Sequence, residues 1–367
     1  MSQKPKIKKR YYRRVKVFFR FLIGKEKMPS KVSYFPDEPH KSAVRIFFEQ
    51  CVHIFRFGEI NRYYYLYGLD VKGTSFKKKG LLAFKEHLDV LYYYNRPRNP
   101  LNYVCILSDK KLFAIVCEYF GISCAKDLGF IDPGQLVVRL NDDVLEDLFH
   151  LLERENNIFC KPLDSECGRG VFSIGRVGEG EYLLNDCPTT REEIECLIGE
   201  INVQLLVQRR LLQHPEMNRM YPKSINTIRL VTIRNRHTGE IEYFHSLLRI
   251  GAGGNVVDNW SQGGVCVGVG EDGVLLAEGY FKPQYGLRTL SHPDTGVVFE
   301  GFEIPYYHEA VEMCKRFHKK IDFIPAIGWD VAITPDGPCL IEANDNWAIS
   351  LHQVYGGLRE RFDSLLR

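Results

Sequence analysis

The segment 328–346, GWDVAITPDGPCLIEANDN, constrains the fold more than any other part of the chain, because it sets acidic side chains within an apolar hairpin pattern. A PDG turn separates two strand-like runs, so Asp330 on the first run can lie opposite Glu342 on the second. Glu342 and Asn344 are two residues apart and therefore share one face of their strand. Two carboxylates and a carboxamide are hard oxygen ligands, which suit a magnesium ion that also holds phosphate oxygens.

The alternative interpretation is a solvated acidic hairpin without a ligand. It fits poorly, because the acids alternate with the apolar residues Trp329, Val331, Ile341 and Ala343. Burying such carboxylates without a cation would cost several kcal/mol. The sequence therefore predicts a metal site on this hairpin.

A second segment, 159–174, reads FCKPLDSECGRGVFSI. A strand delivers Lys161, and a short loop with Gly168, Arg169 and Gly170 leads to the next strand. Glycines let backbone N–H groups approach a phosphate, and a nearby lysine supplies countercharge. The pattern is not a P-loop, since GxxxxGK[ST] is missing and a strand follows instead of a helix. Taken alone, a glycine-rich hairpin is more often a simple turn.

A third set of polar residues lies on predicted strands near the glycine-rich segment 256–264, VVDNWSQGG. These residues are Asn226, Arg229 and Arg249. An arginine on a strand can bind phosphate or carboxylate through two parallel hydrogen bonds. For any one of them a surface salt bridge is the simpler explanation, but three polar residues among apolar strand positions favour a site.

The chain as a whole predicts an α+β fold with largely antiparallel sheets. Strand patterns dominate from Ile158 onward, and EDG and PDG are placed as hairpin turns. Helices are expected at 190–200, at 306–321 and at the C-terminus. Asp109 is a predicted N-cap for a helix that Gly121 ends. Residues 28–105 are rich in aromatics and are predicted to form a mostly helical N-terminal region, with turns near Gly68 and at Pro97–Pro100.

Residues 1–27 form a basic amphipathic arm that contains eleven Lys or Arg and one acid, Glu26. The formal net charge of the whole chain is +3, so the remainder is slightly acidic and binding of the whole protein to nucleic acid is not implied. Aromatic residues recur at helical spacing within the arm. Two interpretations stay open: a surface helix on anionic lipid, or a solvated helix that packs its aromatics on the body. Nucleic-acid binding by the arm ranks third, because no recognised binding module follows it.

The remaining composition points to a cytoplasmic protein, with possible peripheral contact with the inner membrane through the arm. Eleven cysteines show no CxxC pair and no zinc spacing, which favours reduced thiols. No secretory leader and no run of roughly 18–20 apolar residues are present. The oligomeric state is not predicted.

Five segments in this order resemble the ATP-grasp superfamily, and more narrowly the sugar-transfer-associated ATP-grasp proteins related to α-L-glutamate ligases. The resemblance covers roughly residues 100–355, and its sharpest pieces are SDKKLF, CKPLDSECGRGVF, VQRRLLQHPEMNRMYPKSINTIRLVT, VDNWSQGG and GWDVAITPDGPCLIEAN. It implies two α+β subdomains that grip ATP. Residues 106–210 would be the small subdomain with the glycine-rich loop, and residues 211–367 the large subdomain with the metal site.

The resemblance also implies roles for the residues of the small subdomain. Lys110 and Lys161 would bind the ATP phosphates, and Gly168, Arg169 and Gly170 would form a flap over the triphosphate. Where the family carries small residues in this loop, the chain has Glu166 and Cys167, and a carboxylate near a triphosphate is unfavourable unless it faces away or meets a cation.

Further roles concern the hinge and the large subdomain. By resemblance, Gln208 would meet the adenine, with Val207 and Arg209 lining that site, while Asn226 and Arg229 would face the reacting phosphate. Asp330, Glu342 and Asn344 would hold two magnesium ions. The acceptor pocket would be bordered by Arg249, Asp258, Asn259, Gly263 and Gly264.

The implied function is an ATP-dependent carboxylate–amine ligase, in which an acyl phosphate forms and an amine displaces phosphate. The family name implies bacterial surface-polysaccharide synthesis, with an amino acid joined to a sugar acid. Two alternatives stay open: an ATP-grasp kinase that phosphorylates a hydroxyl, and a nucleotide-binding scaffold without turnover. The complete set of Asp330, Glu342 and Asn344 argues against the scaffold, whereas Glu166 favours it slightly.

Overall fold

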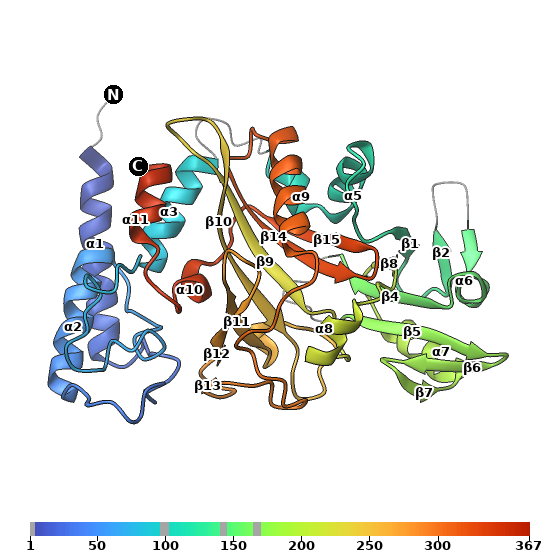
Figure 1. Ribbon diagram of the computed structural model, residues 1–367, viewed down its shortest axis with the longest axis horizontal. Coiled ribbons are helices and arrows are strands. Elements are labelled where there is room, and N and C mark those ends of the chain that lie inside the picture. The colour runs from blue at the N-terminus through green and yellow to red at the C-terminus, as the bar shows by residue number, and fades with distance from the viewer. Residues whose placement is uncertain (1–3, 96–102, 140–144, 164–169) are drawn as a thin grey trace.

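The computed structural model describes residues 4–95, 103–139, 145–163 and 170–367 of the chain. Two sheets and an N-terminal helical layer follow one another along the long axis of the molecule (Figure 1). All pairings between the named strands are antiparallel, so the predicted α+β class with antiparallel sheets is confirmed.

The larger unit is built on a seven-stranded sheet in the order β13-β12-β11-β10-β9-β14-β15. One face carries a hydrophobic core that includes Trp329 and the helix residue Phe317. The strands and the helices near them are β9 (Thr227–Arg234), β10 (Ile241–Ile250), β11 (Val265–Val269), β12 (Leu275–Phe281), β13 (Arg288–Thr289), β14 (Ala326–Thr334), β15 (Gly337–Asn344), α8 (Pro215–Met220), η1 (Trp260–Gln262) and α9 (Tyr307–Lys320).

The helices α4 (Cys105–Ser108) and α5 (Lys110–Tyr119) belong to the core of this larger unit. Asp109 caps α5 by accepting hydrogen bonds from the N–H groups of Lys111 and Leu112, each at 2.9 Å. Leu107 and Phe113 then pack into the large core. The structure therefore differs from the division at residue 106, because the apolar face of α5 is buried against the large sheet and the first strand of the small sheet begins only at Asp127.

The smaller unit is an eight-stranded sheet in the order β3-β2-β1-β8-β4-β5-β6-β7. Its core gathers Leu151, Ile158 and Val207, among others, beneath two helices. The elements are β1 (Asp127–Ile131), β2 (Val137–Arg139), β3 (Leu145–Asp147), α6 (Leu148–Glu155), β4 (Asn157–Pro162), β5 (Phe172–Gly178), β6 (Glu181–Leu184), β7 (Cys187–Thr189), α7 (Arg191–Glu200) and β8 (Leu205–Arg209).

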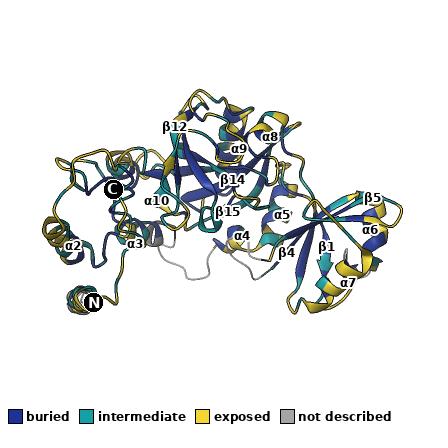
Figure 2. Cartoon of the chain, turned by 90° about the horizontal axis from the view of Figure 1, so that it is seen from below, coloured by how far each residue is buried: buried dark blue, intermediate teal, exposed yellow. Residues whose placement is uncertain are grey.

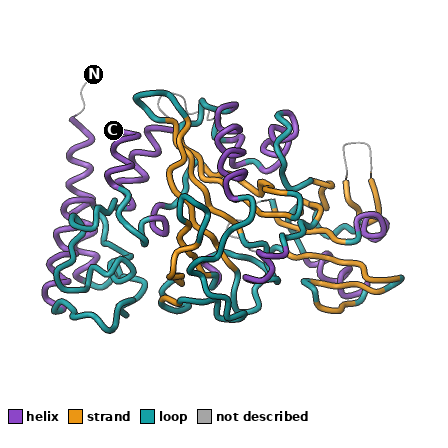
Figure 3. Tube along the Cα trace, viewed as in Figure 1, coloured by secondary structure: helices purple, strands orange, loops and turns teal. Residues whose placement is uncertain are grey.

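The N-terminal layer contains α1 (Lys4–Leu22), α2 (Ala43–Phe57) and α3 (Phe84–Asn95), beside the C-terminal helices α10 (Ile349–His352) and α11 (Arg359–Leu366). Between α2 and α3 the chain runs as loops and turns (Figure 3), so the described part of residues 28–105 contains less helix than predicted, although the expected turn near Gly68 is present. The turn expected at Pro97–Pro100 lies outside the described residues. Gly68 adopts a left-handed conformation there (φ 59°), which breaks any helix at the tyrosine-rich run.

The layer is bonded to the larger unit. The amide of Gln353, next to α10, exchanges two hydrogen bonds of 2.9 Å with the backbone of Leu82, and the Tyr67 hydroxyl donates to the Ser350 carbonyl at 3.1 Å. Leu82 and Leu91 are buried in one cluster with Trp347 and Phe362. Residues 60–91 thus cover one face of the large sheet.

Candidate active site

The hairpin of β14 and β15 places the predicted metal ligands at neighbouring positions. Asp330 pairs directly with Glu342, and Gly328 pairs with Asn344. The register shifts between Asp330 and Val331, so Ile341 is an extra residue in a bulge beside the two acids. Asp330 is almost fully buried, while Glu342 and Asn344 are half-buried.

Two arginines from adjacent strands converge on Asp330. Arg229 on β9 is its register partner, and its guanidinium donates to both carboxylate oxygens, with 3.0 Å from Nη2 to Oδ2. Arg249 on β10 adds a third hydrogen bond, 2.9 Å from Nη2 to the same Oδ2. Burial alone would raise the pKa of Asp330, but the two guanidinium charges outweigh it and lower the pKa to about 2.

Glu342 is in the opposite situation. Burial, followed by the negative charge of Asp330, raises the pKa of Glu342 above its ordinary value. The Asn344 amide donates to Glu342 Oε1 over a long 3.5 Å. The pair of facing carboxylates is therefore electrostatically unfavourable when both are ionised, and a cation beside Glu342 would relieve it.

Arg249 also joins the site to the turn 258–264. Its Nε lies 3.4 Å from Asp258 Oδ2, and Asp258 accepts a 3.0 Å hydrogen bond from the Thr227 N–H. Asp258 is buried, which raises the pKa of its carboxyl despite the nearby Arg249. Asp258 thus anchors the turn to the ends of β9 and β10.

Two glycines give this turn its shape. Gly263 has φ 101°, and a Cβ on Gly264 would lie 2.6 Å from the Asp258 carbonyl oxygen and 2.9 Å from that of Ile250. Such distances exclude any side chain at Gly264. The Gly264 N–H donates to the Asn259 carbonyl at 3.1 Å, so Asn259 contributes through its backbone.

A narrow pocket between the two units brings the predicted phosphate ligands to the metal hairpin. Its wall combines α4 and α5 with both sheets, and consists of Leu107, Lys110, Phe113, Ala114, Cys124, Ala125, Lys161, Gln208, Ile341 and Glu342. Lys161 is buried, and burial is the main cause that lowers the pKa of its amine to about 8, against the attraction of Glu342. A buried amine this close to neutral pH gains from an incoming anion.

Lys110 holds the strand from which the glycine-rich loop begins. Its Nζ donates to the carbonyls of Pro162 and Leu163, each at 3.1 Å. Gly168 and Arg169 lie outside the described residues, as do Glu166 and Cys167. Gly170 has φ 70° beside the Pro162 ring, as a turn into β5 requires.

The strand β8 presents one of its three predicted adenine residues to the pocket. The Gln208 amide donates to Asp127 Oδ1 at 2.6 Å and lines the pocket wall. Val207 points the other way into the small core, and Arg209 pairs with Glu155 at 2.7 Å on the surface. Because side chains alternate along a strand, only the backbones of Val207 and Arg209 remain near Gln208.

The structure places Asn226 differently from the prediction that it faces a reacting phosphate. Its side chain is fully buried, and its Nδ2 donates to the carbonyls of Met217 (3.1 Å) and Tyr221 (2.8 Å). Its Oδ1 accepts from the Gly251 N–H at 3.3 Å. The amide of Asn226 therefore joins the segment before β9 to Gly251, which follows β10.

Two further residues, which the sequence did not predict, belong to the site. The Thr227 hydroxyl accepts a 2.7 Å hydrogen bond from Arg249 Nη2 and donates to Asp258. Asp127 accepts the hydrogen bond from the Gln208 amide. No local motif marks either residue. Their roles depend on the register of β9 with β10 and of β1 with β8.

Comparison with known proteins gives one family. The family model described as sugar-transfer-associated ATP-grasp matches residues 91–365 of this chain. No curated protein matches the chain.

Among solved structures, an N5-carboxyaminoimidazole ribonucleotide synthetase with ADP is 10% identical, with 71% of this chain and 52% of that chain covered and a TM-score of 0.40. The corresponding Staphylococcus aureus synthetase with ADP is 12% identical, with 71% of this chain and 52% of that chain covered and a TM-score of 0.39. The Bacillus anthracis D-alanine–D-alanine ligase with ATP is 12% identical, with 71% of this chain and 66% of that chain covered and a TM-score of 0.36. The chain thus spans about half the length of the two synthetases.

Proposed function

Because the chain belongs to the sugar-transfer-associated ATP-grasp family, we propose that it is an ATP-dependent ligase that joins a carboxylate to an amine through an acyl phosphate. The proposed acceptor is a sugar acid and the proposed amine an amino acid, within the synthesis of a bacterial surface polysaccharide. The word "sugar-transfer" in the family description supports this setting.

One observation carries the proposal: Lys161 of the small unit, Lys110 of α5 and Glu342 of the large sheet line one pocket. Lys161 and Lys110 supply positive charge for a triphosphate, and Glu342, the register partner of Asp330, forms the opposite wall. Phosphoryl transfer is catalysed mainly by positioning and by charge neutralisation, which this arrangement provides without a protein nucleophile.

Magnesium fits the donor set of the hairpin. Among the described residues no group of three His, Cys, Asp or Glu side chains forms a ready metal cluster. Magnesium usually needs only one or two protein carboxylates, since substrate phosphates complete its shell. Asp330, Glu342 and Asn344 would hold the two ions implied by the family resemblance, and the bound metal would neutralise phosphate oxygens.

The arginines would act on the acceptor side. Arg249 lies between Asp330 and the turn at Asp258, where it can receive an acceptor carboxylate. A carboxylate oxygen then attacks the γ-phosphorus and ADP leaves; the amine nitrogen next attacks the acyl carbon and inorganic phosphate leaves. Arg229 would stabilise the transferring phosphoryl group.

The test is ADP release with magnesium and hydroxylamine, across a panel of uronic acids and amino acids, with a metal-free control. Hydroxylamine converts an acyl phosphate into a hydroxamate, so hydroxamate formed with ADP supports the ligase and identifies the activated acid. A phosphorylated hydroxyl product would instead establish a kinase. Nucleotide binding without ADP release on any acceptor would contradict the proposal and favour the scaffold.

A further inference from the structure

The helix α2 carries apolar side chains on the side that faces away from the body. Val44, Phe48 and Val52 recur at intervals of four residues and are 65%, 60% and 66% exposed. Its other side is anchored, since Gln50, His53 and Ile54 are buried. Exposed residues mark α2 at the outer edge of the molecule (Figure 2). A helix of a water-facing surface would carry polar residues at these positions.

The helix α1 lies along α2 and extends this apolar surface. Phe18 contacts Phe55 with ring centroids 5.1 Å apart, and Phe21 stacks on Phe47 at 5.6 Å. Beyond these contacts Phe19 and Ile23 remain largely exposed. Among residues 12–22 of α1 no side chain is fully buried.

A cavity of about 280 Å³ lies between α2 and the loop 61–77, and Phe48 and Val52 are part of its wall. Phe48 and Val52 therefore stay largely exposed although they border this loop. The α1–α2 surface is defined here as a set of exposed apolar residues on α1, directly after it and on α2. They are Tyr12, Phe19, Leu22, Ile23, Val44, Phe48 and Val52.

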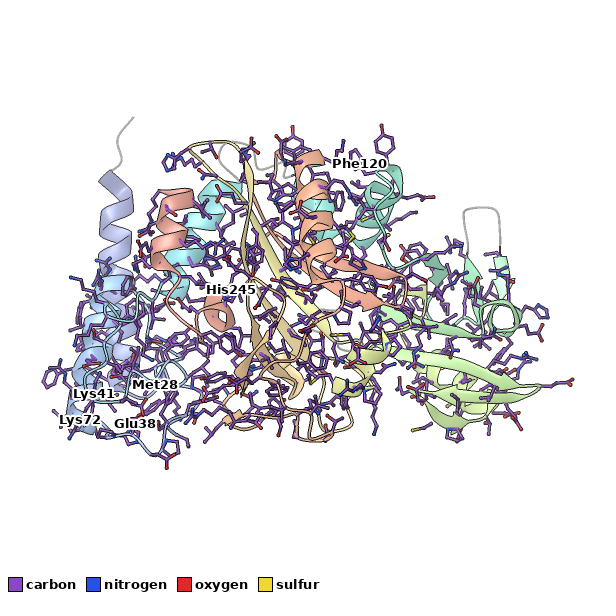
Figure 4. All side chains as sticks on the ribbon, viewed as in Figure 1. Met28, Glu38, Lys41, Lys72, Phe120 and His245 are labelled. Atoms are coloured by element: carbon purple, nitrogen blue, oxygen red, sulfur yellow. The ribbon has the colours of Figure 1, made fainter. Side chains whose placement is uncertain are left out.

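Positive charge surrounds the α1–α2 surface. Residues 1–27 contain eleven Lys or Arg, and their single acid, Glu26, is already paired with Arg20 at 2.8 Å. On α2, Arg45 and Arg56 are exposed. Lys72 lies near the beginning of α2 (Figure 4), whereas the neighbouring Lys41 is mostly buried and pairs with Glu49 at 2.9 Å. Arg45 also pairs with Glu49, at 2.8 Å, so Arg56 and Lys72 are the cations here without an acidic partner among the ion pairs of the described residues.

We propose that the α1–α2 surface docks on an anionic membrane, with both helices lying in the plane of the interface and the stripe of α2 entering it. Apolar residues flanked by cations are the composition that binds anionic lipid, because apolar burial and charge attraction add. No helix among the described residues combines the length and apolarity that crossing a bilayer would need. This role is independent of the ligase proposal and extends the membrane contact beyond residues 1–27.

The test is co-sedimentation of the full chain with vesicles of phosphatidylglycerol and phosphatidylcholine, and with phosphatidylcholine alone. We expect binding to the anionic vesicles that weakens as salt screens the charges. V44E combined with V52E should reduce binding about tenfold or more, because it sets two carboxylates in the interface. Val177→Glu is the matched control, since Val177 on β5 is also 66% exposed but lies in the small unit.

Thermal unfolding of each variant distinguishes loss of binding from loss of folding, since all three positions are exposed. Three results would overturn the proposal. The α2 double variant binds as the wild type does while removal of residues 1–27 abolishes binding; V177E weakens binding equally; or the wild type ignores vesicles and forms a dimer that V44E with V52E dissociates. The last result would make a second copy of the chain the occupant.

Discussion

Asp330→Asn should uncouple the two arginines from the metal hairpin. The carboxylate now accepts two hydrogen bonds from Arg229 and one from Arg249, and it is almost fully buried. An asparagine keeps the size and one acceptor oxygen, but its amide donor faces a guanidinium. The variant therefore leaves two guanidinium charges, which only Asp258, at Arg249, and the nearby Glu342 still offset.

The loss of folding free energy in Asp330→Asn can be worked out from the structure in two ways. The pKa of Asp330 falls from 3.8 to about 2, which corresponds to about 2 kcal/mol of stability at neutral pH. Removing one partner of a buried ion pair costs about 3–5 kcal/mol, and the partly exposed arginines place this case at the lower end. We expect a loss of about 2–3 kcal/mol.

The assay is urea denaturation of the wild type, Asp330→Asn and Asp336→Asn. Asp336 is an exposed acid in the turn of the same hairpin, so its variant should unfold as the wild type does. A lowered pKa stabilises the fold above pH 3.8, and this contribution is lost as the pH falls towards about 2. The difference between the wild type and Asp330→Asn should therefore shrink in acid, while ADP release is lost at every pH.

Equal unfolding midpoints for the wild type and Asp330→Asn at neutral pH would refute the ion-pair argument. Unchanged ADP release would refute the metal assignment separately. The two outcomes are independent, since a structural carboxylate would change the first measurement only.

Three other variants test neighbouring assignments. Lys161→Ala should lower ADP release about 10²–10³-fold with little loss of stability. In the wild type, ATP affinity should fall as the pH rises through about 8, because Lys161 then loses its proton. An ATP affinity that does not change with pH would contradict this. Asn226→Ala should cost about 2 kcal/mol in urea denaturation, because the carbonyls of Met217 and Tyr221 each lose one of two donors; a stable but inactive variant would restore the phosphate role. Gly264→Ala should cost about 1–3 kcal/mol through its clash with backbone oxygens, whereas Gly199→Ala, with open space around it, should be neutral or stabilising by melting temperature.

The sequence predicts those parts of the site that are adjacent in the chain. Period-2 alternation and the PDG turn are sufficient to predict the hairpin of β14 and β15, whereas the pairing of Asp330 with Glu342 also requires the bulge at Ile341, which the pattern does not show. The N-cap at Asp109 follows from local hydrogen bonding in the same way. Such features depend on neighbours within a few residues, so a single sequence contains them.

Features that depend on distant pairing could not be predicted. That Arg249 reaches Asp330 requires β10, β9 and β14 to lie side by side, and no local pattern specifies this order. Asn226 illustrates the opposite error: a polar residue at the start of a strand resembles a ligand, although its amide caps buried carbonyls. The burial of α5 in the larger unit also depends on which sheet offers a matching apolar face.

The packing of residues 60–91 on the large sheet has a consequence for protein engineering. The family match begins at residue 91, yet Leu82 is bonded to Gln353 through both of its backbone groups, and the Leu81 carbonyl accepts from Arg359. A chain cut at the family boundary would bare the apolar surface around Trp347 and Phe362 and should precipitate. Chimeras with other members of the family should therefore exchange the N-terminal layer together with the C-terminal helices. The residues that match the family and the residues that pack into one folding unit do not have the same boundary in this molecule.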